Sequence, residues 1–188
     1  TGVGWTLALT VLSVLIGTLL GIACAWVRAR GFGASLAPAW LQAAVTAYVE
    51  LIRNTPFIVQ LFFIFFGLPA AGVRISAETA SVIAMVINLG AYAAEIIRAQ
   101  TFAWRVLPPA LGKVWPSLVS QIIIVMLGSS VCGQISTREL SHAADLIQGN
   151  NFRSFEAFIV VGGIYLLLSV AMRQLLNWAG AKFLFGRR

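Results

Sequence analysis

The chain has 188 residues, of which 60% are hydrophobic and only 10% charged, and its formal net charge is +7. An ordinary soluble domain has about 25% charged residues, so a chain this apolar has too little polar surface to face water on all sides. The basic residues stand singly or in pairs between long apolar runs, which argues against the clustered patch of a nucleic-acid-binding protein.

Four stretches are apolar enough to cross a bilayer as helices, which takes about 20 residues each. They are 6–26, 76–98, 114–136 and 155–178. A further stretch, 38–70, is longer and is interrupted by Glu50, Arg53 and Pro56. As a straight helix it would far exceed the thickness of the hydrocarbon layer, so it forms either two short spans or one long, kinked span.

The distribution of Lys and Arg between the loops decides between these alternatives. With 38–70 as one span, eight basic residues lie on one side of the membrane and three on the other. The eight are Arg28, Arg30, Arg98, Arg105, Lys113, Lys182, Arg187 and Arg188, and the three are Arg74, Arg138 and Arg153. Cytoplasmic loops carry the excess of basic residues. The sequence therefore predicts an all-α membrane protein, a single domain over 1–188 with five spans, an external N-terminus and a cytoplasmic C-terminus.

A run of polar and helix-breaking residues lies within the long span. It consists of Glu50, Arg53, Asn54, Thr55 and Pro56. Glu50 and Arg53 share a helix face, so we expect the two charges either to neutralise each other or both to bind neighbouring polar groups. Pro56 kinks the helix and frees a backbone carbonyl one turn earlier, which Asn54 and Thr55 can satisfy. A gating cluster of a transporter and a structural ion pair at the cytoplasmic interface explain this run equally well.

Polar side chains also lie inside the third and fourth spans. Candidates for lining a substrate pathway are Asn88, Gln121, Ser129 and Ser130. A polar group at bilayer depth usually faces the protein interior or a wet cavity, although hydrogen bonds between helices would explain the glutamine and the serines equally well. Glu95 joins the polar cluster of the second span as a candidate gating residue. Its rival interpretation is an interface residue beside Arg98, three positions further on.

Small residues recur at four-residue spacing in several predicted helices. They are Gly17 with Gly21, Gly128 with Cys132, and Ser129 with Gly133, and the fifth span has adjacent Gly162 and Gly163. Such residues let backbones approach closely, so we expect all of them at helix contacts.

No catalytic or metal-binding motif is recognisable in the chain. The single histidine, His142, lies in a loop, and no HExxH, GxSxG or GxxxxGK[ST] occurs. Cys24 and Cys132 lie in apolar stretches without a second ligand type nearby, so we expect buried thiols, no metal and no cofactor. The sequence predicts a protein that is not an enzyme, and uphill transport would need energy from another subunit.

Several runs resemble signature segments of one membrane-protein family. The run 48–69, YVELIRNTPFIVQLFFIFFGLP, closely resembles the second-span signature of permeases of polar amino-acid ABC importers, which serve histidine, arginine, glutamine, glutamate and opines. The run 89–99, LGAYAAEIIRA, resembles their third-span signature, and 128–140 is similar to the end of their fourth span. The run 105–111, RVLPPAL, resembles the end of their cytoplasmic coupling loop. On this resemblance, the remnant of the coupling loop comprises Arg98, Arg105, Leu107 and Pro108.

The resemblance implies the five-helix fold of type I importer permeases and transport by alternating access. It implies a second permease subunit, identical or different, two cytoplasmic ATP-binding subunits, and a periplasmic or lipid-anchored amino-acid-binding protein. It also implies location in the bacterial inner membrane. Two alternatives remain: a permease of a neighbouring importer family for organic cations or osmolytes, and a membrane scaffold subunit without a pathway.

One departure from the family concerns coupling to the ATPase. In the family, the third-span run is followed by a long cytoplasmic segment that carries Glu-Ala-Ala and a glycine and docks into the ATP-binding subunit. Here the third-span run ends at Ala99 and Gln100 follows at once. The runs on both sides match the family, so we expect that a coupling segment of the native protein is missing from this sequence near 99–100.

Overall fold

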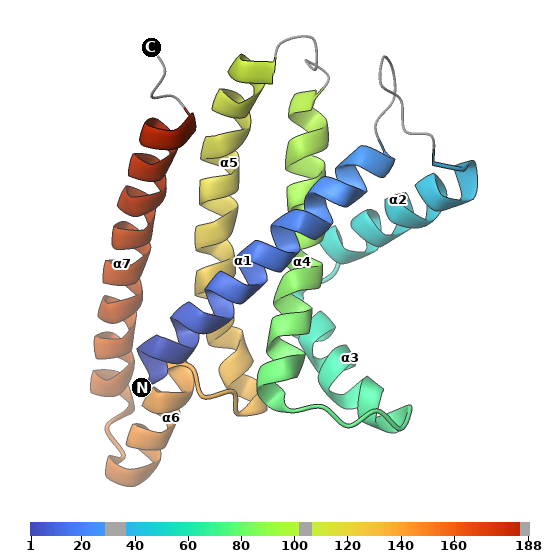
Figure 1. Ribbon diagram of the computed structural model, residues 1–188. Coiled ribbons are helices and arrows are strands. Elements are labelled where there is room, and N and C mark those ends of the chain that lie inside the picture. Colours follow the sequence, from blue (N-terminus) through green and yellow to red (C-terminus); the bar gives the residue numbers. More distant parts are fainter. Residues whose placement is uncertain (29–36, 102–106, 185–188) are drawn as a thin grey trace.

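The computed structural model describes residues 1–28, 37–101 and 107–184, and all regular structure within these ranges is helical. Figure 1 shows α1 crossing in front of α4, with α5 and α7 on one side and α2 and α3 on the other. The helices are α1 (Gly2–Val27), α2 (Ala39–Arg53), α3 (Phe57–Ala70), α4 (Ala77–Thr101), α5 (Leu107–Gly128), α6 (Leu140–Asn151) and α7 (Ser154–Ala179). A 3-10 helix, η1 (Ser129–Ile135), continues α5, and a π-helical turn, η2 (Gly180–Leu184), continues α7.

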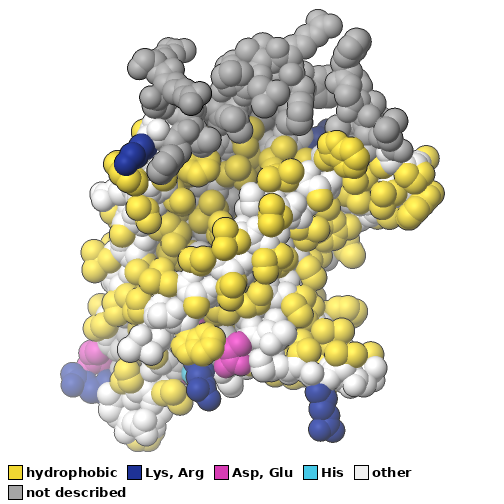
Figure 2. All heavy atoms as spheres, in the orientation of Figure 1, with side chains coloured by type: hydrophobic (Ala, Val, Ile, Leu, Met, Phe, Trp, Pro, Cys, Tyr) yellow, Lys and Arg dark blue, Asp and Glu magenta, His cyan; other side chains and the backbone are white. Residues whose placement is uncertain are grey.

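The predicted fold class, an all-α membrane protein, is confirmed. Helical segments long and apolar enough to cross a membrane are Gly2–Val27, Ala77–Ala99, Val114–Ile135 and Ser154–Lys182. The pair α2 and α3 provides a fifth crossing if the two halves form one bent span. On the face seen in Figure 2, the charged side chains of the described residues lie toward the ends of the bundle and leave an apolar middle.

The stretch 38–70 differs from the kinked span that the sequence predicts. It forms two helices that meet at 111° across a break of three residues, 54–56. Pro56 adopts an extended backbone conformation, with φ −62° and ψ 139°, at the position that precedes α3. Because proline has no N–H to donate, α2 cannot continue through it, and the chain turns sharply there.

Helix α4 is the centre of the bundle and contacts α1, α2, α3, α5 and η1. Small buried side chains along it let its neighbours approach closely. The core cluster around its outer half, the half nearer Ala77, comprises Leu9, Leu61, Ala80, Ala84, Met85, Leu89, Val125, Cys132 and Ile135. A second cluster around its inner half comprises Cys24, Val49, Ala91 and Ala94. Both cysteines are free and buried.

The face of α1 that packs on α4 is a stripe of small residues. It comprises Thr6, Thr10, Ser13, Gly17 and Gly21, all buried. The two ends of α1 carry exposed tryptophans, Trp5 near its start and Trp26 near its end. Helix α1 therefore presents small side chains to α4 and large aromatic side chains at its two ends.

Gly133 of η1 packs closely on Glu139, but three glycines of α5 and α7 behave differently. A Cβ atom built on Gly128, Gly162 or Gly163 would meet no atom within 4 Å among the described residues. The expectation that these glycines mark helix contacts is therefore wrong within the chain. The apolar pattern shows which residues suit a helix, but it does not show which helix faces pair.

Candidate functional site

Gln60, on α3, bridges the break between α2 and α3. Its side chain is almost fully buried, and its Nε2 donates to the carbonyl oxygens of Ile52, at 2.8 Å, and Thr55, at 2.9 Å. The Ile52 carbonyl is the one that Pro56 leaves without its helical donor. Asn88 of α4 donates in turn to Gln60 Oε1 at 3.0 Å. One amide side chain thus links both half-helices to the central helix.

The polar residues before Pro56 donate hydrogen bonds to the last backbone carbonyls of α2. Asn54 Nδ2 donates to the Glu50 carbonyl at 2.7 Å and lies 3.3 Å from the Glu50 carboxylate. Thr55 Oγ1 donates to the Leu51 carbonyl at 2.9 Å. Glu50 and Arg53 do not pair with each other in the described part of the chain. Each instead lies against a neighbouring polar group, as the second alternative predicts: Glu50 against Asn54, and Arg53 against Glu95 of α4.

Glu95 of α4 is the centre of an arginine cluster. Its carboxylate lies 3.0 Å from Arg28 at the end of α1 and 4.0 Å from Arg53 of α2, and it also pairs with Arg98, one turn along α4. Glu95 thus pairs with Arg98 and also contacts the broken span through Arg53, and its role as a gating or an interface residue stays a prediction. One carboxylate cannot neutralise three guanidinium groups, so an excess of positive charge remains.

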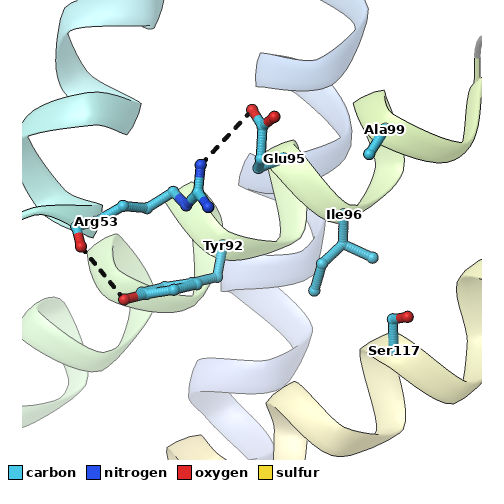
Figure 3. A pocket seen from close by; sticks show the side chains of 6 residues that line it. All are labelled: Arg53, Tyr92, Glu95, Ile96, Ala99 and Ser117. Carbon is cyan, nitrogen blue, oxygen red and sulfur yellow. Dashed lines mark hydrogen bonds and ion pairs between the residues drawn. The ribbon is translucent and has the colours of Figure 1, made fainter.

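A cavity of about 260 Å³ adjoins this cluster, between α2, α4 and α5. Its lining comprises Arg53, Tyr92, Glu95, Ile96, Ala99 and Ser117 (Figure 3). The Arg53 guanidinium lies over the Tyr92 ring, with its Cζ 5.7 Å from the ring centroid. The Tyr92 hydroxyl donates to the Arg53 carbonyl at 3.5 Å. The aromatic ring thus supports the arginine at the edge of the cavity.

One face of α4 connects the bridge at Gln60 with this cavity. Asn88, Tyr92, Ile96 and Ala99 follow one another at spacings of three or four residues and therefore share that face. Asn88 bonds Gln60, and the other three line the cavity. The result is a continuous face that starts at the break and ends at the arginine cluster.

The other predicted pathway residues lie elsewhere. Ser129 and Ser130 each donate to a carbonyl three residues earlier, both at 2.7 Å, and so serve the junction between α5 and η1. Gln121 is buried. No described contact joins these three residues to Asn88, so their role in a pathway stays a prediction.

The coupling-loop remnant is described only in part. Arg98 pairs with Glu95, and Leu107 and Pro108 lie in the first turn of α5. Arg105 lies outside the described residues.

At the opposite end of the bundle, Glu139 organises helix α6, which the sequence analysis treated as a loop. Glu139 is fully buried, and its carboxylate accepts the backbone N–H groups of Ser141, at 2.8 Å, and His142, at 2.7 Å. The Tyr165 hydroxyl of α7 donates to it as well. Burial raises the pKa of the Glu139 carboxyl, and these hydrogen bonds act in the opposite direction. Glutamate is not a usual N-cap residue, so local sequence does not indicate this cap.

Replacing Gln60 by leucine is expected to lower the free energy of unfolding by about 2 kcal/mol, because two carbonyls and the Asn88 amide lose their partner inside the bundle. Thermal unfolding of the purified protein in detergent measures this change. Gln148→Leu is the matched control, since its amide bonds Asp145 one turn earlier in α6 and no second partner among the described residues, and we expect a change below about 0.5 kcal/mol. Equal effects of the two changes would show that Gln60 does not hold the break.

No protein-family model matches the chain. Curated relatives do match it over most of their length. The glutamine transport system permease protein GlnP of Escherichia coli K12 is 32% identical over 200 residues, which cover 94% of this chain and 88% of that protein. The probable glutamine ABC transporter permease protein GlnM of Bacillus subtilis is 30% identical over 194 residues, which cover 92% of this chain and 87% of that protein.

Solved structures match as well. The crystal structure of an amino acid ABC transporter with histidines superposes with a TM-score of 0.84 at 32% identity, over 97% of this chain and 92% of that one. An inward-facing structure of the MetNI methionine ABC transporter superposes with a TM-score of 0.69 at 21% identity, over 98% of this chain and 94% of that one. The second likeness concerns the fold alone.

Proposed function

The chain belongs to the family of amino-acid ABC transporter permeases, and on this premise we propose that it forms one half of the translocation pathway of an ATP-driven importer of polar amino acids. The family places it in the inner membrane as a permease subunit that works with other ABC transporter components. Two of its relatives are named for glutamine, which makes L-glutamine the first substrate to test.

The observation that carries this proposal is the face of α4 that runs from Asn88, beside the broken span, to the cavity at Arg53. Half-helices that meet inside the membrane recur at transporter binding sites, because their free backbone groups and polar side chains meet the solute there. Here the break lies against Asn88 and Gln60, and the same face of α4 continues to the Arg53 cavity. A scaffold subunit without a pathway would not need polar side chains such as Asn88 and Gln60 at bilayer depth, where burying polar groups costs free energy.

The proposed partners follow from what the chain lacks and what its family needs. No phosphate-binding motif occurs in the sequence, so hydrolysis of ATP falls to two cytoplasmic subunits. A second permease, identical or different, completes the pathway. An external binding protein, either periplasmic or lipid-anchored, delivers the amino acid.

The test is transport by the reconstituted complex. The permease is purified with the ATP-binding subunits and an amino-acid-binding protein from the same organism, and placed in liposomes loaded with ATP. We expect uptake of at least one of L-glutamine, L-glutamate, L-arginine and L-histidine, dependent on both ATP and the binding protein. ATP turnover without accumulation of any of the four would reject the polar amino-acid assignment.

The proposed orientation predicts which residues are accessible from outside. Single cysteines placed at Arg74 and His142 should react with an impermeant thiol reagent added to intact spheroplasts, and one placed at Arg187 should not. The native Cys24 and Cys132 are buried and give little background. Labelling at Arg187 without permeabilisation would invert the topology. Arg187 itself lies outside the described residues.

The missing coupling segment is a proposal that the relatives support. The alignment with GlnP runs over 200 residues although this chain has only 188, so GlnP carries residues that have no counterpart here. If the native protein has the segment near 99–100, trypsin will not release the continuous peptide 99–105 from it. Mass spectrometry of the protein from its own cells decides this, and detection of the peptide AQTFAWR would establish that the deletion is real.

A further inference from the structure

The three arginines around Glu95 are not equivalent. Arg28 lies 3.0 Å from the carboxylate and Arg98 pairs with it directly, whereas Arg53 lies at 4.0 Å. A charge-assisted hydrogen bond to a carboxylate is about 2.8 Å long, so Arg53 stands at the limit of an ion pair. Its guanidinium donors are therefore only weakly engaged by Glu95.

Arg53 is also the arginine that lines the cavity. Its side chain is 35% exposed, and the Tyr92 ring lies beneath its guanidinium, which restricts its orientation. Ser117 lies across the cavity on α5 (Figure 3). Ile96 and Ala99 add an apolar wall from α4. The cavity thus offers a cation, a hydroxyl and an apolar surface, and the Glu95 carboxylate that also lines it is paired with Arg28 and Arg98.

We propose that this cavity binds the α-carboxylate of the transported amino acid, with the Arg53 guanidinium as its anchor and the Ser117 hydroxyl as a second donor. The planar fork of arginine matches the two oxygens of a carboxylate. The volume of about 260 Å³ lies just below the range of about 300–1,000 Å³ usual for small-molecule sites, which suits a single small solute. The site would recognise the group that all amino acids share, on the Arg98 side of the α2–α3 break. This inference rests on the proposed function.

Binding is tested on the permease with its ATP-binding subunits, without the binding protein, in nanodiscs of phosphatidylcholine. The probes are L-glutamine, L-glutamate, L-arginine and L-histidine, each compared with its α-carboxamide, and the Kd is measured by calorimetry. We expect Arg53→Gln to raise the Kd of the transported amino acid about 10- to 100-fold, as loss of a charged hydrogen bond does, and Arg53→Lys to raise it less.

The α-carboxamide separates binding from a merely structural role. It lacks the carboxylate, so it should bind weakly to the wild type, and Arg53→Gln should change its Kd less than about twofold. If Arg53 only supported the fold, both ligands would weaken equally. Arg74→Gln is the matched control, since Arg74 is exposed between α3 and α4, and it should leave both Kd values unchanged.

Two results would overturn the inference. The first is unchanged affinity of Arg53→Gln for the amino acid, and the second is absence of amino-acid binding to a complex that transports. In the second case the transport function stands and the site falls. The complex could also bind amino acids through Arg53 and the carboxylate but transport none of the four. That result would support the site and reject the transport function.

Discussion

Replacing Gly21 by leucine is expected to lower the free energy of unfolding by about 3 kcal/mol or more. A Cβ atom at this position would lie 2.5 Å from the Ala93 Cβ and 3.1 Å from the Ala94 nitrogen and the Gly90 carbonyl oxygen. Two of these contacts are backbone atoms of α4, which cannot rotate away as a flexible side chain can. Added volume in a packed contact forces helices apart, at a cost of about 1–3 kcal/mol or more.

Thermal unfolding in detergent, read by circular dichroism, measures the effect of the Gly21 change. Gly162→Leu is the control, because a Cβ there meets nothing within 4 Å among the described residues. Leucine is a better helix former than glycine by roughly 0.5–1 kcal/mol, so the control should be neutral or slightly stabilising. Similar losses at both positions would show that the α1–α4 contact is not the tight one.

Replacing Glu139 by alanine is expected to cost about 3 kcal/mol, because three donors lose their acceptor together. Two are backbone N–H groups at the start of α6, and the third is the Tyr165 hydroxyl of α7. Hydrogen bonds to a charged acceptor contribute about 1.5–3 kcal/mol each, and buried donors left without partners add a desolvation cost. We expect α6 to detach from α7, seen as faster amide hydrogen exchange over 140–151.

Two further variants calibrate the Glu139 result. Tyr165→Phe removes one of the three hydrogen bonds and should cost about 1 kcal/mol. Asp145→Ala removes an acid of the same helix whose carboxylate accepts from Gln148, and we expect less than about 0.5 kcal/mol. If Glu139→Ala resembled Asp145→Ala, the carboxylate would be dispensable as a cap.

Much of the fold could be predicted from apolar length alone. The stretches 6–26, 76–98, 114–136 and 155–178 each fall on a membrane-length helix, because burial in hydrocarbon selects long apolar helices whatever their neighbours are. The position of the break could also be predicted, since proline prevents the helix from continuing. The angle of 111° between the two helices could not be predicted, because the packing of both helices on α4 sets it.

Most contacts of the candidate site could not be predicted from the sequence. Arg28 and Glu95 meet across 67 positions of the chain, and local spacing says nothing about such a pair. Local spacing also suggested the pair Glu50–Arg53, but Arg53 lies against Glu95 and the Tyr92 ring of α4, which sequence spacing cannot show. Glu139 was missed for a related reason, since a carboxylate in a loop is normally solvated and only the fold buries it.

The two exposed tryptophans of α1 make this helix a gauge of membrane thickness. Trp5 and Trp26 are 21 positions apart, which is about 31 Å along a helix and close to the roughly 30 Å depth of the hydrocarbon layer. Indole side chains prefer the two interfaces, so a thicker bilayer favours an upright α1 and a thinner one favours more tilt. Helix α1 crosses α4 obliquely (Figure 1), so a change in its tilt shifts Gly17 and Gly21 against α4. Hydrophobic mismatch would thus act directly on the close contact between α1 and α4.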